Sequence, residues 1–413
     1  MKLQKLTLTL LTALFIACSD SDNDSMPAPI PDGEALEITT QVTADENGKF
    51  ITDVCVKGNN IVIDWGDGKR ETVSSEEHTT DFLHQYAKSG TYTIKIEKAP
   101  IRELIIGNAM GTLSSELTVS ACSSLEKLEI TILSNLRSFA VTNCPKLSVF
   151  KAAVCPKLTE LNLSGISTLK HLECLDCKRL ASLNLNTQSQ LTYLQCSETN
   201  IKNLNLSNNP LIERLILAQT PITSIDLSRQ TELEILQLIQ TQLTDIDLSH
   251  NEILSDLVCI TNPIDELDLS HCPLLRKLNC TNCGLSALDV SANTQLYILA
   301  CPENELTALD LSNNKELIGL QCRHNLLTEL TLNNNKEINL LDCGENKMER
   351  DALETLFDTL PDFTSKAVKG DLTPPRPQRL IAIQGNPGAE RCAKQIFEKK
   401  GWEEVQNLGN YIQ

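Results

Sequence analysis

The chain has 413 residues, a formal net charge of -18 and an aromatic content of only 4%. Several ordinary globular domains of this total length would need more aromatic side chains to fill their cores. A repeat architecture avoids that need, because each repeat covers only its two neighbours and stacked leucines fill the core. The 54 acidic residues outnumber the 36 basic ones, and no basic stripe offsets them locally. Composition therefore favours a repeat protein and excludes nucleic acid as a partner.

The first 17 residues have the order of a secretory signal. Two lysines precede an apolar run over residues 6–16, which is too short to span a bilayer, and Ala17 stands before Cys18. The sequence FIAC, which ends at Cys18, resembles a bacterial lipobox, in which cleavage leaves the cysteine N-terminal and lipid-modified. The resemblance implies that residues 1–17 are a lipoprotein signal peptide and that Cys18 anchors the protein in a membrane. A plain secretory signal is the alternative.

Residues 18–33 are mostly acidic and small side chains with prolines, which predicts a flexible tether. The acidic string SDSDNDS directly after Cys18 resembles the export signal that places Bacteroidetes lipoproteins on the outer face of the outer membrane. The resemblance implies an outer-membrane lipoprotein that is exposed on the cell surface. A solvated spacer is the simpler interpretation of the same string.

Residues 34–99 alternate apolar and polar side chains, as in FITDVCV and TYTIKI, with turn-forming clusters between them. This period of two is typical of strands. The turn WGDG begins at Trp65 and is followed by the other residues of a motif, His84, Tyr86 and Gly90. Their order resembles the PKD-like immunoglobulin-type domains, which implies a β-sandwich in which the motif is structural. The two carboxylates near the turn are too few for Ca²⁺, which binds six to eight oxygens.

Over residues 100–346 the pattern LxxLxL returns in steps of 10 or 11 residues. Two steps make a unit of 21 or 22 residues, which is within the range of leucine-rich repeats. Eight positions after the first leucine, most units carry Asn or Cys. Such side chains can bond to the partly buried turns, whose backbone groups need partners. The pattern predicts a leucine-rich-repeat solenoid over these residues.

In alternate units the sixth position is cysteine, at Cys174, Cys196, Cys259, Cys280, Cys301, Cys322 and Cys343. This ladder resembles the cysteine-rich members of the internalin family, whose repeat runs LxxLxCxxNxLTxLDLSxN. Residues 296–314 read LYILACPENELTALDLSNN. The resemblance implies a curved solenoid that binds partner molecules outside the cell.

Residues 347–413 no longer follow the repeat. We expect helices over residues 349–360 and 389–400, with a strand and turn at RLIAIQGNPG between them. A terminal repeat cannot leave its leucines in water, so these residues should form a small α/β cap. The predicted fold class is mainly β, with a curved leucine-rich-repeat solenoid, an N-terminal β-sandwich and this cap.

The cysteines predict neither a metal site nor disulfides. The CxxC pairs Cys174–Cys177 and Cys280–Cys283 are five repeats apart, on the order of 24 Å, which is too far for one zinc site. In-register stacked side chains also point the same way, whereas an S–S bond needs them turned toward each other. Aspartates of the LDL half-repeats form a second ladder, where a bound cation is the alternative to serine and water. We expect no metal and no cofactor.

Catalytic motifs are missing from the sequence. The six histidines show no HExxH spacing, and no GxSxG turn occurs. The segment GNPG over residues 385–388 lacks the Gly-Lys-Ser/Thr ending of a phosphate-binding loop. We therefore expect no catalytic residues and no enzyme.

Side chains between the buried positions of the cysteine half-repeats should face the inner surface of the curve. They would gather into an apolar patch of Ile216, Ile235, Ile239, Val258, Ile260 and Ile298, flanked by Tyr193, Arg214 and Lys277. Contiguous exposed apolar side chains usually mark a partner site, although strand propensity alone also favours β-branched residues.

These observations predict a lipid-anchored cell-surface binding protein, of adhesin or receptor type, that recognises an extracellular protein or glycan. The alternative is a structural or assembly component of the bacterial envelope that acts through protein–protein contacts. The oligomeric state does not follow from the sequence.

Overall fold

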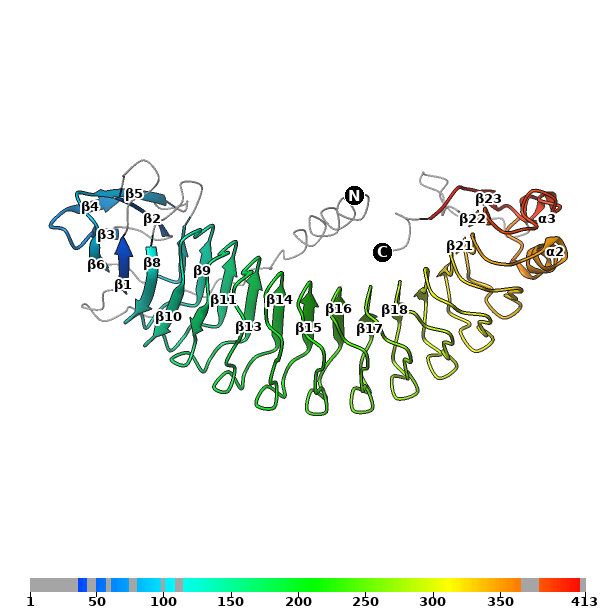
Figure 1. The fold of residues 1–413 in the computed structure, drawn as a ribbon, viewed down its shortest axis with the longest axis horizontal. Helices are drawn as coiled ribbons and strands as arrows, with labels where there is room; N and C mark the ends of the chain where they lie inside the picture. The colour runs from blue at the N-terminus through cyan, green and yellow to red at the C-terminus, as the bar shows by residue number, and fades with distance from the viewer. Residues whose placement is uncertain are drawn as a thin grey trace. The chain divides into compact units, whose positions relative to one another are not determined.

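The computed structural model describes residues 36–42, 50–56, 61–73, 80–97, 101–107, 114–364 and 379–408. The predicted signal peptide, the tether and Cys18 lie outside the described residues. Gly33–Gln413 form one compact unit, and Met1–Asp32 are a separate one. The larger unit is mainly β, and its repeats build a β-solenoid of about 13 turns (Figure 1), which confirms the predicted fold class.

Two β-sheets run through the described residues. The smaller sheet contains, in spatial order, β12 (Glu160–Asn162), β10 (Ser138–Thr142), β8 (Ser114–Ser120), β1 (Leu36–Val42), β6 (Gly90–Glu97), β3 (Ile61–Asp64) and β4 (Arg70–Val73). The larger sheet begins with β5 (Thr80–Tyr86), β2 (Phe50–Val56), β7 (Glu103–Ile106), β9 (Lys127–Thr131) and β11 (Val149–Ala153). It continues with β13 (His171–Leu175), β14 (Tyr193–Ser197), β15 (Arg214–Ala218), β16 (Ile235–Ile239), β17 (Asp256–Val258), β18 (Lys277–Asn279), β19 (Ile298–Ala300), β20 (Gly319–Gln321), β21 (Leu340–Asp342), β22 (Leu380–Ala382) and β23 (Glu403–Glu404).

The N-terminal strands and the first repeats share both sheets. β1 pairs antiparallel with β8, and β2 pairs antiparallel with β7. Leu104 on β7 and Leu117 on β8 are buried. A solenoid has to cover the apolar side of its first repeat. The N-terminal strands provide that cover, because their sheets continue directly into those of the solenoid (Figure 1).

The turn that follows β3 is held by aromatic side chains. Trp65 is fully buried, and its carbonyl oxygen accepts a hydrogen bond of 3.1 Å from Tyr86 Oη. The His84 ring stacks on Trp65 with 4.6 Å between ring centroids, and its Nε2 lies 3.0 Å from Asp67 Oδ2. All four side chains therefore have a structural role in positioning the turn.

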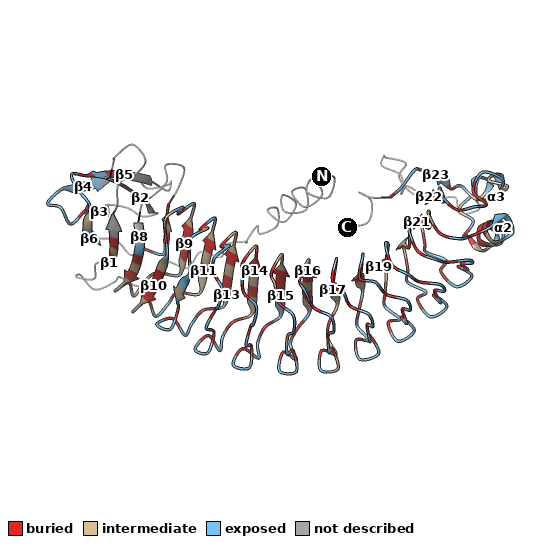
Figure 2. Ribbon diagram, in the orientation of Figure 1, coloured by how far each residue is buried: buried red, intermediate tan, exposed pale blue. Residues whose placement is uncertain are grey.

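The repeat strands from β13 to β21 are parallel and in register, so the same repeat position stacks from one strand to the next. Leu194 pairs with Leu215, and Leu215 with Leu236, and all three are fully buried. The sixth position stacks in the same way, as with Cys174 and Cys196. Loops project from the edge of the array opposite to the strands, and Figure 2 shows that exposed residues concentrate there.

Buried asparagines join neighbouring repeats at their turns, as the repeat pattern predicts. Asn325 Nδ2 donates to the carbonyl oxygens of Cys301 (2.9 Å) and Cys322 (3.1 Å). Its Oδ1 accepts from the backbone N–H of Leu306 (3.0 Å). The residue before it, His324, has a left-handed φ of 59° that tightens the turn. Equivalent bonds to the carbonyl oxygens of the preceding repeat recur at Asn304 and Asn346.

The C-terminal part forms the expected α/β cap. The helix α2 (Arg350–Thr359) buries Leu353, Leu356 and Phe357. β22 and β23 add two strands to the end of the larger sheet, and β22 lies within the segment predicted to be a strand. Among the described residues, neither helix combines the length and the apolar character that crossing a bilayer requires.

The second predicted helix is shorter than expected. The helix α3 spans Gln395–Lys399 only, whereas the sequence predicts a helix over residues 389–400. The backbone N–H of Cys392 bonds to Gly388 O, and that of Ala393 bonds to the Glu354 carboxylate (2.9 Å). A Cβ on Gly388 would lie 2.2 Å from the backbone nitrogen of Arg350. This packing against α2 holds residues 389–394 in turns.

Replacement of a buried turn asparagine should destabilise the solenoid. Asn325→Ala would leave the buried backbone N–H of Leu306 without a partner. It would also remove one of the two side-chain bonds to each of the carbonyl oxygens of Cys301 and Cys322, which Asn304 and Asn346 also contact. We expect the free energy of unfolding to fall by about 1–3 kcal/mol. Urea denaturation of residues 19–413 measures this change. The matched control is Asn334→Ala, because Asn334 bonds to Ser312 O from an exposed loop and should lose under about 1 kcal/mol. Equal losses in both variants would contradict the prediction.

Candidate functional site

The face of the larger sheet that points away from the core is here called the strand face. It consists of the side chains at alternate strand positions that are not stacked inside the solenoid. All predicted patch residues lie on it or at its margin: Tyr193 on β14, Arg214 and Ile216 on β15, Ile235 and Ile239 on β16, Val258 on β17, Ile260 two residues after the end of β17, Lys277 on β18 and Ile298 on β19.

Four predicted patch residues come together at the centre of the strand face. Ile235 and Ile239 belong to β16, Val258 belongs to the neighbouring strand β17, and Ile260 follows β17. The register of the two strands pairs Ile235 with Asp256 and Gln237 with Val258. The ladder continues beyond β17, where Gln240 N donates to Ile260 O (2.8 Å). We call this set the central strand patch: Ile235, Gln237, Ile239, Asp256, Val258 and Ile260. All six side chains are half-buried, so each retains surface that a partner can contact.

Two isoleucines of the predicted patch do not join the central strand patch. Ile216 is only 3% exposed, so the prediction that it forms part of the exposed surface is wrong. It pairs in register with Gln195 on one side and Gln237 on the other, and their longer side chains flank it. Ile298 packs against a second apolar cluster that contains Leu408, and it too lies outside the central strand patch.

The predicted flanking cations are directed toward aromatic rings on the outer sides of the patch. The Arg214 guanidinium lies 5.9 Å from the centre of the Tyr193 ring, and Lys277 Nζ lies 5.9 Å from that of the Tyr297 ring. Cation–π contacts of this kind are modest in energy at exposed sites. They hold the two positive charges beside the central strand patch.

A polar network that the sequence analysis did not identify lies next to Tyr193. The rings of His171 and Tyr193 stack with 4.0 Å between centroids, and His171 Nε2 is 2.5 Å from Glu173 Oε1. Lys151 Nζ is 2.9 Å from the same oxygen. Burial favours a higher pKa for Glu173, but the bonds from His171 and Lys151 outweigh it and lower the pKa. The register alone, which stacks residues 171 and 193, could have indicated this network.

Asp256 differs from these side chains, because its carboxylate has no hydrogen bond or ion pair within 4.0 Å among the described residues. It lies between Ile235 and Lys277 in the stacked row. Burial raises the pKa of Asp256, and the charges of Lys277 and Arg214 only partly oppose that rise. The central strand patch thus contains an incompletely solvated carboxylate between an apolar side chain, Ile235, and a cationic one, Lys277.

The cysteine ladder is part of the core. Cys259, Cys280, Cys301 and Cys322 are at most 1% exposed, and the described cysteines carry free thiols. Burial raises the pKa of Cys301 to about 12, which keeps the thiol neutral. In the part of the chain that the structure describes, no three His, Cys, Asp or Glu side chains are arranged to hold a metal ion.

The aspartate ladder of the LDL half-repeats has a structural role in the loops. Asp247 Oδ1 accepts a hydrogen bond of 2.9 Å from the backbone N–H of Ser249, two residues later. Bonds from the Ser249 hydroxyl and backbone lower the pKa of Asp247. The same backbone bond recurs throughout the ladder, at Asp226, Asp268, Asp289 and Asp310. These carboxylates therefore bind their own turns.

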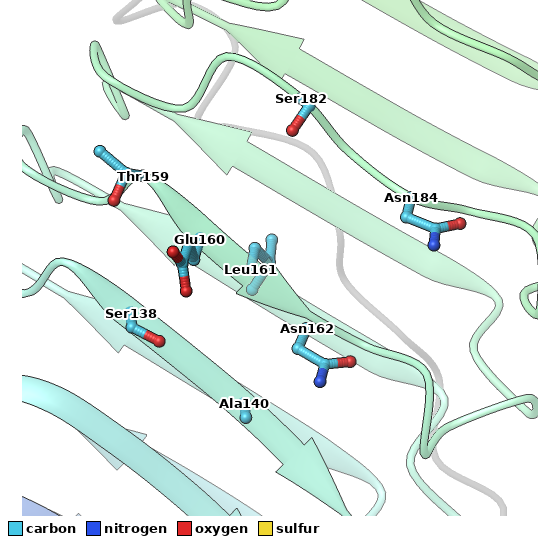
Figure 3. A pocket seen from close by; sticks show the side chains of 8 residues that line it. All are labelled: Ser138, Ala140, Thr159, Glu160, Leu161, Asn162, Ser182 and Asn184. Carbon is cyan, nitrogen blue, oxygen red and sulfur yellow. The ribbon is translucent and has the colours of Figure 1, made fainter.

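A depression of about 290 Å³ lies on the smaller sheet (Figure 3). It is beside the edge strand β12, and its lining consists of Ser138, Ala140, Thr159, Glu160, Leu161, Asn162, Ser182 and Asn184. None of these side chains is buried. Asn162 Oδ1 already accepts bonds from both the backbone N–H and the hydroxyl of Ser164. Such a shallow polar surface lacks the enclosed apolar walls typical of small-molecule sites.

Removal of the Asp256 charge should stabilise the protein at neutral pH. The pKa of Asp256 is raised in the folded protein, so protonated Asp256 favours the folded state over the unfolded chain. This stabilisation is complete below the unfolded-state pKa of about 3.9. It is lost as the pH rises through the folded-state pKa. We expect Asp256→Asn to unfold at higher urea concentration than the wild type at pH 7.5, with the difference vanishing near pH 3. Asp247→Asn is the control and should show no gain, because the pKa of Asp247 is lowered. A lower midpoint for Asp256→Asn at pH 7.5 would refute the prediction.

The chain matches no protein-family model and no curated protein sequence. Solved structures similar to it include two internalins from Listeria monocytogenes. The internalin InlF has a TM-score of 0.50 and 15% identity, over 73% of this chain and 86% of that chain. The functional domain of InlJ, described as including a cysteine ladder, has a TM-score of 0.42 and 24% identity, over 66% and 74%. At these identities the likeness to InlF concerns the fold, and no conclusion rests on InlJ. The chain is a leucine-rich-repeat β-solenoid with internalin-type structural neighbours.

Proposed function

We propose that this protein is a binding scaffold of the bacterial surface and that the central strand patch is its binding site. The observation that carries the proposal is the group of four half-buried isoleucine and valine side chains on two neighbouring strands. Burial of apolar surface is the main driving force of most protein–protein association. The partner that fits best is an extracellular protein, because four of the six patch side chains are apolar and only Gln237 and Asp256 could form hydrogen bonds with a glycan.

The arrangement of the strand face favours binding over catalysis. Polar groups elsewhere on the strand face either pair with each other, as His171 and Glu173 do, or contact aromatic rings, as Arg214 does. Among the described residues Asp256 forms no hydrogen bond or ion pair within 4.0 Å, although the charges of Lys277 and Arg214 act on it. A general acid or base needs a partner within hydrogen-bond reach of a substrate site. We therefore propose a protein that is not an enzyme.

Location at the cell surface is proposed from the sequence of the N-terminal residues. A lipid-modified Cys18 would anchor the chain, and residues 18–33 would hold the domains away from the membrane. We further propose that residues 34–99 form a PKD-like domain, in agreement with the buried Trp65 and its contacts with His84 and Tyr86. In this arrangement the solenoid extends outward with its strand face accessible.

The patch is tested with purified residues 19–413 on arrays of extracellular-matrix proteins and glycans. We expect a protein ligand whose binding falls at least tenfold in the double variant Ile239→Asp, Ile260→Asp, because two charges would have to be desolvated at the interface. The control is Leu211→Asp, Leu274→Asp, which adds the same charges at two leucines that are each 40% exposed on loops. Binding that survives in the first variant would exclude the patch. If no array component binds, a partner within the bacterial envelope becomes the better hypothesis.

Lipid attachment is tested by metabolic labelling of the full chain with radioactive palmitate in a Gram-negative host. We expect label in the wild type and none in Cys18→Ala, because the thiol is the point of attachment. Cys392→Ala, a change at a half-buried cysteine of the cap, should retain the label. Label that persists in Cys18→Ala would show that this cysteine is not lipidated, and an unlabelled wild type would favour a plain secretory signal.

A further inference from the structure

The chain crosses its own strand face after β23. Val405 N donates to Ile381 O (2.9 Å), which continues the pairing of β23 with β22. Beyond that point, residues 406–408 are bound by side chains that project from the strand face at and beside β20 and β21. The strand face therefore already holds one peptide segment, which bends at Gln406. It lies at the opposite end from the polar network of Glu173.

Two neighbouring side chains hold the backbone of Leu408 from both sides. Asp342 Oδ2 accepts from Leu408 N (3.1 Å), and Gln321 Nε2 donates to Leu408 O (3.2 Å). Gln321 and Asp342 are register partners on β20 and β21, so the solenoid itself sets the spacing of this clamp. Arg323 adds a third bond, from Nη1 to Gln406 O (3.4 Å). All three bonds go to main-chain atoms, so they do not depend on the sequence of the bound segment.

The side chain of Leu408 fills an apolar pocket. It is fully buried, and together with Leu380 it forms a cluster against which Ile298, Leu340 and Val405 pack. Main-chain hydrogen bonds combined with a pocket for one side chain are the usual means of recognising an extended peptide. The bonds supply affinity, and the pocket selects leucine or a residue of similar size and polarity.

The clamp depends on its occupant. Asp342 is 3% exposed, and besides Leu408 it bonds to the backbone N–H of Gly344 (3.2 Å) and lies 3.7 Å from Arg323 Nη1. Burial raises the pKa of Asp342 despite these contacts. The Asp342 carboxylate needs a hydrogen-bond donor, and the neighbouring Gln321 amide needs an acceptor. Their partner must therefore both donate and accept a hydrogen bond. A peptide unit meets that need.

We propose that Gln321, Arg323 and Asp342, with the apolar side chains of Ile298, Leu340 and Leu380, form a second binding site. It takes a peptide segment through its main chain and one leucine-like side chain. Residues 406–408 occupy it as a ligand in cis that can detach while the repeats stay folded. The same segment of a second copy of this chain would then bind in the same manner, because residues 406–408 already match the hydrogen bonds and the apolar pocket of the site. This site is separate from the central strand patch, and its test does not depend on the proposed function.

The first experiment measures native-state hydrogen exchange on the full chain. We expect the Leu408 amide to exchange at least tenfold faster than the amides of β20 and β21, because it opens locally rather than with the solenoid. Asp342→Asn and Leu408→Asp should each accelerate the exchange of Leu408 further and leave that of β16 unchanged. Exchange of Leu408 at the same rate as β21 would show that the segment is a fixed part of the cap and would overturn the proposal.

The second experiment tests binding in trans. A variant that ends at Val405 keeps β23 and lacks the segment, and the probe is a fluorescein-labelled peptide with the sequence of residues 404–413. We expect this peptide to bind the shortened variant at least tenfold more tightly than the intact chain, where the cis segment competes at high effective concentration. The same peptide with Leu408→Asp should bind at least tenfold more weakly.

The outcome is decisive in either direction. Circular dichroism first establishes that the shortened variant is folded. A folded variant that does not bind the peptide, or that binds the Leu408→Asp peptide equally well, would overturn the proposal. If the variant does not fold, the hydrogen-exchange result on the intact chain decides.

Discussion

The structure depends on one constraint, which is that every buried turn of a repeat must find hydrogen-bond partners in the next repeat. A unit of 21 or 22 residues is too small to bury its own backbone. Asn325 shows the solution, because its side chain bonds to carbonyl oxygens of its own repeat and of the preceding one. The stacking that results places parallel strands in register, and the register then decides which side chains are neighbours on the strand face.

Strand alternation divides the residues of each repeat between the core and the strand face, and three environments follow along that face. Near β13 the polar side chains satisfy each other, as His171 and Glu173 do. Around β20 and β21 the strand face is covered by the chain itself through Leu408. Between these regions neither its own side chains nor its own backbone cover the central strand patch. The unpaired carboxylate of Asp256 lowers the free energy of unfolding, and the half-buried apolar side chains leave apolar surface in water. Contact with a partner would offset both costs.

Both ends of the solenoid are closed by structures of another kind. The N-terminal strands continue the two sheets of the first repeats, and α2 with its buried Phe357 covers the last one. The sequence indicates a need for these elements, since a repeat pattern that stops leaves leucines without neighbours. It does not indicate their details. The helix expected over residues 389–400 begins only at Gln395, because contacts of Ala393 and Gly388 with α2 compete with helical hydrogen bonds.

The sequence by itself determined the solenoid, its register and the rows of side chains, because a repeat of 21 or 22 residues with recurring leucines leaves only one alignment of equivalent positions. That alignment was enough to place Ile239 beside Ile260. Only the tertiary structure decided which side chains in the rows remain accessible. Ile216 is covered by flanking glutamines, and Ile298 packs with Leu408 from the far end of the chain. The accessibility of a side chain depends on the length and direction of its neighbours. It also depends on segments that return from distant positions in the sequence. A repeat pattern gives no information on either.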